Sequence, residues 1–460
     1  MSHPIVLIHG YSDVPESFKR WETILTRHGL DVSNVHICGY RSLTNEVTIK
    51  DIAEGFDRAL RLRAGLSADE PFDAIVHSTG MLVIRAWLTT YAKQDKRKQR
   101  LKRLIALAPA SFGSPLAHKG RSWLGAIFKG NRELGPDFMD AGDLILDGLE
   151  LASRYTWDLA HQDLLSRKVF YGPDPDTPYV FTFCGADNYG GLQGLVTNPK
   201  GTDGTVRWAG CSLNTRKITL NLTVDEDQDT TTQRVHFGDW QTDHRSNLSI
   251  PFIPVADLNH GSIIEEPTDE LVELVVKALK VSTGEEYAEW NRAAIEQTRT
   301  TLRKMTPWQQ FLVRAVDERD DAITDYHVTF KAGYEKNPRD LKPIEVDVHT
   351  YSGDKSLRSF HFNLKDLDLE KLVRLRIEII ASSGTDLVRY YGHIDAPEDK
   401  NERESATQKW TAVFDMDELL KNRDVKLFEP FTTSLIELRL NREPEPWLPN
   451  GTRVTWFVEK

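Results

Sequence analysis

The chain has 460 residues, of which 40% are hydrophobic and 28% are charged, as in an average globular protein. This length exceeds what one hydrophobic core usually organises, so we expect two domains. The net charge of -11 argues against nonspecific nucleic-acid binding, which needs clustered Lys and Arg. No apolar run approaches the roughly 18 residues that a transmembrane segment needs.

The cysteine content and the N-terminal sequence indicate in which cellular compartment the protein is expected. Cys38, Cys184 and Cys211 are an odd number without Cys-x-x-Cys spacing, which predicts free thiols in a reducing environment. No basic stretch at the N-terminus leads into an apolar stretch of signal-peptide length. We therefore expect a cytoplasmic protein, with non-classical export left open.

Residues 1–283 form the first predicted domain. Short β-branched runs alternate there with amphipathic helical patterns, which indicates a mostly parallel sheet covered by helices on both faces. A last helix begins near Thr268, a candidate N-cap followed by two acidic residues. We expect strands at residues 5–8, 35–38, 72–76, 104–107 and 179–183.

Residues 112–170 interrupt this alternation. They carry apolar residues at helical spacing, Trp123, Phe128 and Trp157 among them, and no strand pattern. We interpret the segment as an inserted helical cap, because long insertions after a strand are often functional lids. An ordinary packed helical excursion is the alternative, with the three aromatic residues in its own core.

A second domain is predicted after a helical linker at residues 284–307. This domain is expected at residues 308–460, and from about Thr324 the sequence changes to period-two alternation of apolar and polar residues, which is typical of antiparallel strands. We expect a C-terminal β-sandwich-like domain that braces the first domain or binds a partner. The apolar sets are Ile344, Val346 and Val348; Val373, Leu375, Ile377 and Ile379; Ile436, Leu438 and Leu440; and Val454, Trp456 and Val458.

Ser78 is the strongest candidate for chemistry. An apolar strand runs into His77-Ser78-Thr79-Gly80 and passes at once into a helical run. A serine on such a sharp strand-to-helix turn is exposed at the carboxyl edge of the sheet, near the positive end of the helix. The alternative is a serine that only caps the helix.

The first strand also ends in a glycine turn, Ile8-His9-Gly10-Tyr11. Acyl transfer needs two N–H donors aimed at the oxyanion of the intermediate. The N–H of Thr79, next to the serine, would be one donor, and the N–H of Tyr11 would be the other. An ordinary strand turn is the alternative.

Together with two later motifs, the His9-Gly10 loop and the Ser78 turn resemble the α/β-hydrolase superfamily, in particular its lipase branch, over about residues 4–282. The family pattern is Gly-x-Ser-x-Gly, and this chain has Val76 at the first glycine position. The C-terminal third resembles no family that we can name.

The resemblance implies the remaining two members of a catalytic triad, in the chain order serine, acid, base. Gly201-Thr202-Asp203-Gly204 is similar to the acid loop of lipases, and Asn259-His260-Gly261 is similar to their histidine loop. Asp187, directly after the predicted strand 179–183, is a rival for the acid. In this interpretation His260 is the general base and Asp203 orients it.

The resemblance implies a serine carboxylic ester hydrolase, and an apolar cap favours lipid-like or other hydrophobic esters. The same triad would serve a phospholipase, thioesterase, amidase or acyltransferase, and a non-catalytic binding protein with this fold is a further alternative. We expect no cofactor, because the sequence has no glycine-rich phosphate loop after a strand. We also expect no metal site, because neither His-Glu-x-x-His nor paired cysteine ligands occur, and we interpret the acidic run 225–229 as a solvated loop.

Overall fold

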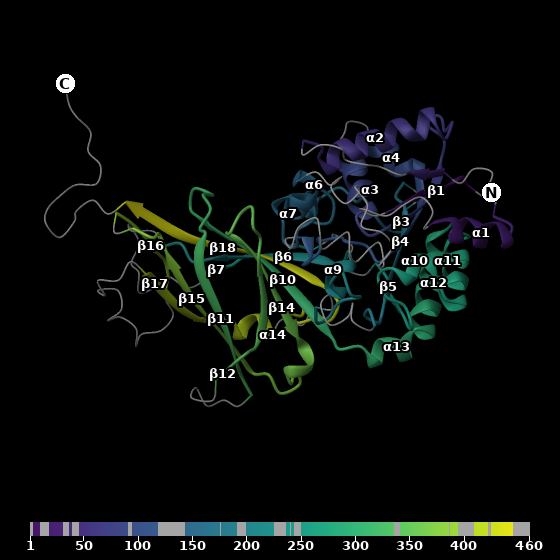
Figure 1. Cartoon of the computed structure of the whole chain (residues 1–460). Coiled ribbons are helices and arrows are strands. Elements are labelled where there is room, and N and C mark those ends of the chain that lie inside the picture. The colour runs from purple at the N-terminus through teal and green to yellow at the C-terminus, as the bar shows by residue number, and fades with distance from the viewer. Residues whose placement is uncertain are drawn as a thin grey trace, which may run out of the picture. The chain divides into compact units, whose positions relative to one another are not determined.

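The structure is a computed structural model that describes residues 3–9, 18–30, 36–38, 46–90, 94–117, 143–174, 176–190, 199–224, 236–239, 241–242, 250–334, 341–385, 387–393, 409–421 and 425–444. The chain divides into two compact units (Figure 1). The first unit contains residues 1–215, 242–308 and 431–433, and the second contains residues 216–241, 309–430 and 434–460.

A six-stranded parallel sheet is the centre of the first unit. Its central strands are apolar and buried on both faces, as expected where helices cover a parallel sheet. The strand order is β2 (His36–Cys38), β1 (Ile5–Ile8), β3 (Phe72–His77), β4 (Leu101–Leu107), β5 (Tyr179–Gly185) and β9 (Phe252–Val255).

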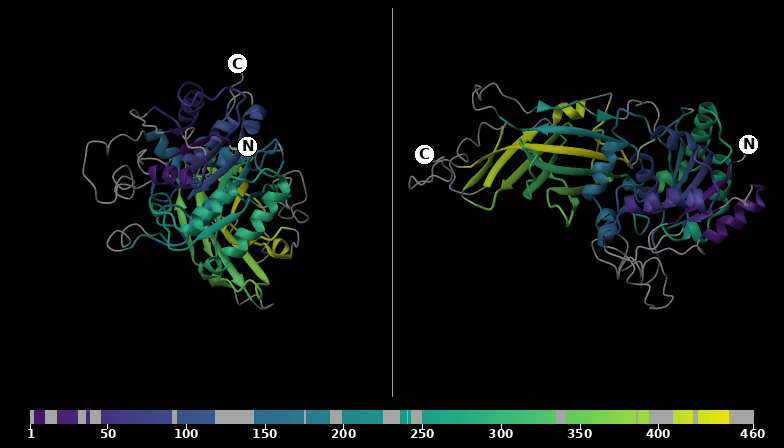
Figure 2. Two further views of the ribbon diagram at one scale, coloured as in Figure 1. Left: turned by 90° about the vertical axis from the view of Figure 1, so that its right-hand side faces the viewer. Right: turned by 90° about the horizontal axis from the view of Figure 1, so that it is seen from above.

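Helices lie on both sides of this sheet (Figure 2). On one face, aromatic and aliphatic side chains of α1, α11 and α12 share a core with alternate strand residues such as Ile75 and Phe181. On the other face, Phe56 of α2, Phe72 of β3 and Trp87 of α3 pack edge to face. The helices are α1 (Lys19–Arg27), α2 (Ile49–Leu62), α3 (Gly80–Thr89), α4 (Gln94–Arg100), α9 (Trp208–Cys211), α10 (Ser262–Glu265), α11 (Asp269–Ala278), α12 (Gly284–Gln297) and α13 (Arg299–Lys304).

The predicted helical cap contains two described helices, α6 (Asp143–Leu149) and α7 (Arg154–Gln162), between β4 and β5. Ser153 caps α7, since its hydroxyl accepts a hydrogen bond from the N–H of Thr156. Trp157 is 2% exposed and therefore belongs to the packed interior. Trp123 and Phe128 lie outside the described residues.

The second unit is a sandwich of two sheets around one core of aliphatic and aromatic residues. In β15, Leu375, Ile377, Ile379 and Ala381 point into that core and alternate with more exposed residues, as the sequence predicts. One sheet has the order β12 (Lys342–Pro343), β11 (Asp325–Gly333), β15 (Arg374–Ser382) and β17 (Lys409–Asp415), and all its pairs are antiparallel.

The other sheet of the second unit contains strands from distant parts of the chain. Its antiparallel pairs include β13–β14, β6–β7 and β16–β18. A short helix, α14 (Asp417–Lys421), follows β17. The strand order is β13 (Val346–Thr350), β14 (Leu357–Asn363), β10 (Trp308–Asp317), β18 (Thr433–Pro444), β6 (Thr215–Asn221) and β7 (His236–Phe237), with β16 (Val388–Tyr391) on β18 and β8 (Gln241–Thr242) on β6.

The fold class agrees with the sequence analysis: a mostly parallel, helix-covered sheet with a helical insertion, and a β-sandwich-like second unit. The division of the chain differs from the predicted boundaries in two places. Residues 216–241 belong to the second unit, and the predicted linker at 284–307 belongs to the first. The linker is not a spacer, because Tyr287 and Trp290 of α12 are buried in the first-unit core.

The strand predicted around Val454, Trp456 and Val458 lies outside the described residues, as does the acidic run 225–229. Among the helices that the structure describes, none combines the length and the apolar composition needed to cross a membrane.

Candidate active site

Ser78 lies on a tight turn between β3 and α3. Its φ angle is 53°, a left-handed value that is uncommon for a residue with a side chain. Hydrogen bonds hold this conformation, because the N–H of Ser78 donates to the carbonyl of Leu107 at 3.2 Å and its carbonyl accepts from the N–H of Ala110 at 3.1 Å. The strained turn places the serine at the carboxyl edge of the sheet, where the sequence predicts it.

Gly80 lets the turn pack against β1. A Cβ atom at this position would lie 2.7 Å from the carbonyl oxygen of Ile8, a backbone atom that cannot move aside easily. Val76, at the position of the family's first glycine, is buried within β3 and pairs with Ile8 and Ala106 of the neighbouring strands. The departure from the glycine pattern therefore falls inside the regular strand, before the turn begins.

Ser78, His260 and Asp203 form one chain of hydrogen bonds. His260 Nε2 lies 3.1 Å from Ser78 Oγ, and His260 Nδ1 lies 2.9 Å from Asp203 Oδ2. A carboxylate only accepts, so Nδ1 carries the proton, and Nε2 is left to accept the hydrogen bond from the serine hydroxyl. The three side chains are at most 2% exposed.

The turn after Asp203 fixes its carboxylate. Asp203 Oδ1 accepts hydrogen bonds from the N–H groups of Thr205 at 3.0 Å and Val206 at 2.8 Å. Gly204 has φ +99°, and a Cβ there would lie 2.4 Å from the ring of Tyr189. The N–H of His260 also donates to the Asp203 carbonyl at 3.0 Å, so the two loops are joined through their backbones as well.

His77 braces the loop that carries His260. Its Nε2 lies 2.9 Å from the His260 carbonyl oxygen, and the two rings lie 4.8 Å apart between centroids. Burial holds the pKa of His77 well below its usual range, so the ring is neutral and Nε2 carries the proton donated to the carbonyl. No local sequence pattern indicates this contact, because it joins residues 183 positions apart.

Asp187, the alternative candidate for the acid, contacts the backbone of Asp257 and not His260. It is exposed, and its Oδ2 accepts a hydrogen bond from the N–H of Asp257 at 2.6 Å. Asp257 has a left-handed φ of 61°. Asp187 therefore stabilises the turn that leads into the histidine loop, whereas the carboxylate on His260 Nδ1 is that of Asp203.

The predicted oxyanion donors are described in part. Thr79 immediately precedes α3, where the first N–H groups have no carbonyl four residues earlier to bond. Its N–H, next to Ser78, stays the first predicted oxyanion donor. Tyr11, the second predicted donor, lies outside the described residues.

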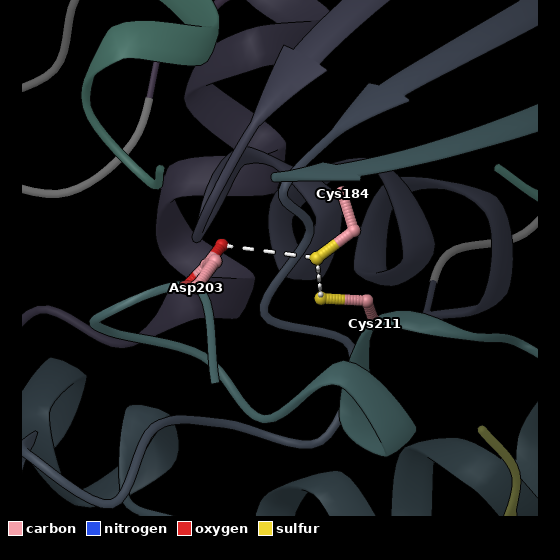
Figure 3. Close-up of side chains that lie close together, drawn as sticks. All are labelled: Cys184, Asp203 and Cys211. Carbon is pink, nitrogen blue, oxygen red and sulfur yellow. Dashed lines mark hydrogen bonds between the residues drawn. The ribbon is translucent and has the colours of Figure 1, made fainter. Parts of the chain in front are cut away.

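Two cysteines lie beside Asp203 (Figure 3). Cys184 Sγ, at the end of β5, is 3.5 Å from Cys211 Sγ of α9 and 4.0 Å from Asp203 Oδ2. Both are free and buried, and burial raises the pKa of both thiols above the usual value. The sulfur atoms and a carboxylate oxygen lie within 4.8 Å of one another, a group that could hold a metal ion and that the sequence spacing does not reveal.

Polar contacts tie the helical cap to the site. Ser114 Oγ donates to the carbonyl of Thr205 in the Asp203 turn at 2.7 Å. The same serine exchanges backbone hydrogen bonds with Leu149 and Leu151, at the end of α6. The segment that carries α6 is therefore anchored directly to the loop of the candidate acid.

Helix α3 has a second anchor at Arg85. Its guanidinium holds Asp163 with two hydrogen bonds, of 2.7 Å and 2.8 Å, and the carbonyl of Ser111 with a third. Tyr171 donates to the same carboxylate at 2.8 Å. Arg85 and Asp163 are fully buried, so this pair fixes the helix that follows Ser78 against the end of α7.

This chain is similar to known proteins in its three-dimensional structure. No family model matches the sequence, and no curated protein matches it. Phospholipase PlaB from Legionella pneumophila has a similar structure, with a TM-score of 0.76 and 21% identity over 96% of this chain and 94% of that one. Its structure in complex with thio-NAD gives a TM-score of 0.74 and 20% identity over the same shares.

The likeness to PlaB extends over nearly the whole length of both chains and shows a common fold. The parallel sheet, the serine turn after β3 and the order of the loops are those of the α/β-hydrolase fold that the sequence predicts.

Proposed function

We propose that the chain is a serine hydrolase of carboxylic esters, with Ser78 as nucleophile, His260 as general base and Asp203 as the acid that orients the base. The hydrogen-bond chain from Ser78 Oγ through His260 to Asp203 Oδ2 carries this proposal. The left-handed φ angle of Ser78 also supports the proposal, because strained backbone conformations of this kind are concentrated at functional sites.

The reaction begins when Ser78 Oγ attacks the ester carbonyl and His260 Nε2 takes the hydroxyl proton. Asp203 stabilises the imidazolium through its hydrogen bond to Nδ1 and stays ionised. The N–H of Thr79 and the N–H of Tyr11 stabilise the oxyanion. His260 then returns the proton to the leaving alcohol, and an ester between Ser78 and the acyl group remains.

Water completes the cycle in the same geometry. His260 accepts a proton from the water molecule that attacks the acyl-enzyme, and then returns it to Ser78 Oγ as the carboxylic acid leaves. The reaction needs no oxidant or reductant, because each step moves only protons and an acyl group.

For the substrate we propose a lipid-like ester. The near-complete burial of the serine, at 2% exposure, supports a site that excludes water, which suits a hydrophobic acyl chain. A phospholipid is a second candidate, favoured by the likeness to the phospholipase PlaB over both units of the chain. Its hydrolysis uses the same steps on a glycerol ester.

A fluorophosphonate probe tests the nucleophile. We expect the probe to label the folded wild-type chain and the exposed-serine control Ser67→Ala, and to leave Ser78→Ala unlabelled. Circular dichroism shows whether each variant is folded. A folded wild-type chain that resists the probe would contradict the proposal and favour a non-catalytic binding protein.

The substrate class needs a second assay. We expect hydrolysis of p-nitrophenyl esters to rise from acetyl to medium and long acyl chains, and fatty acid to be released from phosphatidylcholine vesicles if phospholipids are substrates. Equal rates on all chain lengths would contradict a lipid-like substrate but would leave the nucleophile in place.

A further inference from the structure

We propose that Cys184, Cys211 and Asp203 form a binding site for a thiophilic divalent cation such as Zn²⁺, and that occupation of this site reversibly inhibits hydrolysis. Binding depends only on the three side chains. The inhibition rests on the function proposed for Ser78, His260 and Asp203.

The chemical class of the cation follows from the donors. Two sulfur atoms and one carboxylate oxygen are ligands that Zn²⁺ and Cd²⁺ prefer, whereas Ca²⁺ and Mg²⁺ prefer sets of oxygen atoms. Three protein ligands leave one position of a tetrahedral ion for an exchangeable ligand, as in zinc sites that are not purely structural. This arrangement suits reversible binding.

The distances fit one ion. With Zn–S bonds of about 2.3 Å and Zn–O bonds of about 2.1 Å, tetrahedral angles separate two sulfur ligands by about 3.8 Å, and sulfur from oxygen by about 3.6 Å. In the structure the two sulfur atoms are 3.5 Å apart, and Cys184 Sγ lies 4.0 Å from Asp203 Oδ2. Shifts of a few tenths of an ångström would bring these two pairs of atoms to coordination distance. All three donor atoms lie within 4.8 Å of one another, so Cys211 Sγ and the carboxylate would approach each other by at most about 1.2 Å.

The donors are positioned by separate elements of the first unit, as Figure 3 shows. Cys184 is fixed in β5, and the carbonyl of Cys211 accepts a hydrogen bond from Ser111 Oγ at 3.2 Å. Asp203 Oδ1 is occupied by two backbone N–H groups, so Oδ2 is the oxygen that faces the sulfur atoms. The site is thus largely preformed, which lowers the cost of assembling it around an ion.

The same oxygen links the site to hydrolysis. Asp203 Oδ2 accepts the hydrogen bond from His260 Nδ1. A cation on Oδ2 would withdraw electron density from this bond, and its charge would oppose the imidazolium that forms when Ser78 loses its proton. Binding releases the two thiol protons to solvent and forms two metal–sulfur bonds and one metal–oxygen bond, without electron transfer.

Cadmium titration of the reduced full-length chain, at one fixed and mildly alkaline pH, tests the site directly. Cadmium bound by thiolates absorbs in the ultraviolet, so the absorbance reports binding whether or not the chain is an enzyme. We expect one ion per chain. We expect Cys184→Ala and Cys211→Ala each to weaken this binding at least about tenfold, the smallest loss typical even of residues that only support a ligand.

Cys38→Ser is the matched control, because it removes the remaining cysteine of the chain and keeps the proposed pair. We expect it to bind cadmium as the wild type does. Circular dichroism and two independent alanine variants separate a lost ligand from a lost fold. Binding that disappears in Cys38→Ser, or persists in both alanine variants, would overturn the proposal.

Inhibition is measured on p-nitrophenyl butyrate, each variant against its own rate without metal. We expect Zn²⁺ to inhibit the wild type and Cys38→Ser at least about tenfold more strongly than Cys211→Ala, and a chelator to restore the rate. Equal inhibition of all variants would refute the link to hydrolysis. Mass spectrometry after alkylation of the denatured chain counts thiols: a Cys184–Cys211 disulfide with no cadmium signal would refute the site.

The two proposals fail separately. A cadmium signal in a chain that hydrolyses no ester supports the metal site and contradicts the proposed function. Ester hydrolysis without a cadmium signal supports the proposed function and contradicts the metal site.

Discussion

Both carboxylate oxygens of Asp203 accept hydrogen bonds, Oδ1 from the turn backbone and Oδ2 from His260 Nδ1. In Asp203→Asn, the amide oxygen would keep the backbone donors, and the amide NH₂ would face Nδ1. The histidine would then carry its proton on Nε2 and could not accept the Ser78 proton. We expect kcat to fall about 10³–10⁴-fold, measured on p-nitrophenyl butyrate.

Asp187→Asn is the matched control for that substitution. Its amide oxygen would still accept the hydrogen bond from the N–H of Asp257, so we expect kcat within a few-fold of wild type. A large loss in Asp187→Asn with little change in Asp203→Asn would reverse the assignment of the acid.

Gly204 is required at the Asp203 turn for two reasons: its φ is +99°, and the ring of Tyr189 occupies the space of a side chain. We expect Gly204→Ala to lower the free energy of unfolding by about 2 kcal/mol through backbone strain, and to lower kcat by displacing the carboxylate. Thermal unfolding and ester hydrolysis measure the two effects. Gly190→Ala is the control, because a Cβ there meets nothing within 4 Å; equal behaviour of the two variants would contradict the role of the turn.

At the residue scale, the sequence motifs located Ser78, Asp203 and His260, which the structure brings together. These residues could be predicted because each lies in a short local motif with a characteristic chain order. The choice between Asp187 and Asp203 could not be settled, because both follow β5 and differ only in which loop reaches His260. The contacts of His77 and Cys184 depend on residues far along the chain, so no local pattern indicates them.

At the element scale, the buried pair of Arg85 and Asp163 joins α3 to the end of α7. Removing the guanidinium in Arg85→Met would leave a buried carboxylate without its cation, which typically costs about 3–5 kcal/mol. We expect a loss of this size in urea unfolding. Because α3 begins beside Ser78, we also expect weaker fluorophosphonate labelling at temperatures where the variant is still folded.

Arg154→Ala is the control for Arg85→Met, since Arg154 pairs with Asp158 on the exposed face of α7. Surface pairs contribute little, and we expect a change within about 0.5 kcal/mol. Similar losses for both variants would show that α7 contributes stability independently of the buried pair.

The strands that could be predicted are those with one clear pattern. β15 alternates between core and surface, and β1 and β3 are short apolar runs before a turn. The sequence does not predict β10, because nearly all of its residues are buried, Gln309 and Gln310 included, so neither period two nor an apolar run appears. β9, at the edge of the sheet, is also not predicted, because it has only four residues and one of them is Pro254, a residue type that argues against a strand.

At the scale of the whole molecule, the two units are not consecutive in sequence. β6 belongs to the sheet of the second unit although its residues lie between the candidate acid and base. The sequence predicts the boundary at 283, because Thr283-Gly284 follows the last helix of the first domain and because β6 mixes polar and apolar residues without a clear strand pattern. Only the long-range pairing of β6 with β18 reveals the true division.

This connectivity predicts how fragments behave. A fragment of residues 1–307 would keep β6 but lose β18, its partner in the sheet. Ile218, Leu220 and Leu222, which are buried in the second-unit core, would then be exposed next to an unpaired strand edge. Such edges recruit other chains, so we expect the fragment to self-associate in gel filtration with light scattering.

A matched fragment separates this cause from a general loss of stability. In it a short Gly-Ser linker replaces residues 217–240; because β6 and β8 are paired strands, their ends lie close enough for such a linker. Both fragments lack residues 431–433 and keep α12, so they differ only in the segment that belongs to the second unit. We expect the linker fragment to be the more monomeric of the two. A monomeric 1–307 fragment would mean that β6 is not an aggregation-prone edge and that the second unit is dispensable for the solubility of the first. Equal association of both fragments would place the cause of association outside residues 217–240 and would contradict the role of β6.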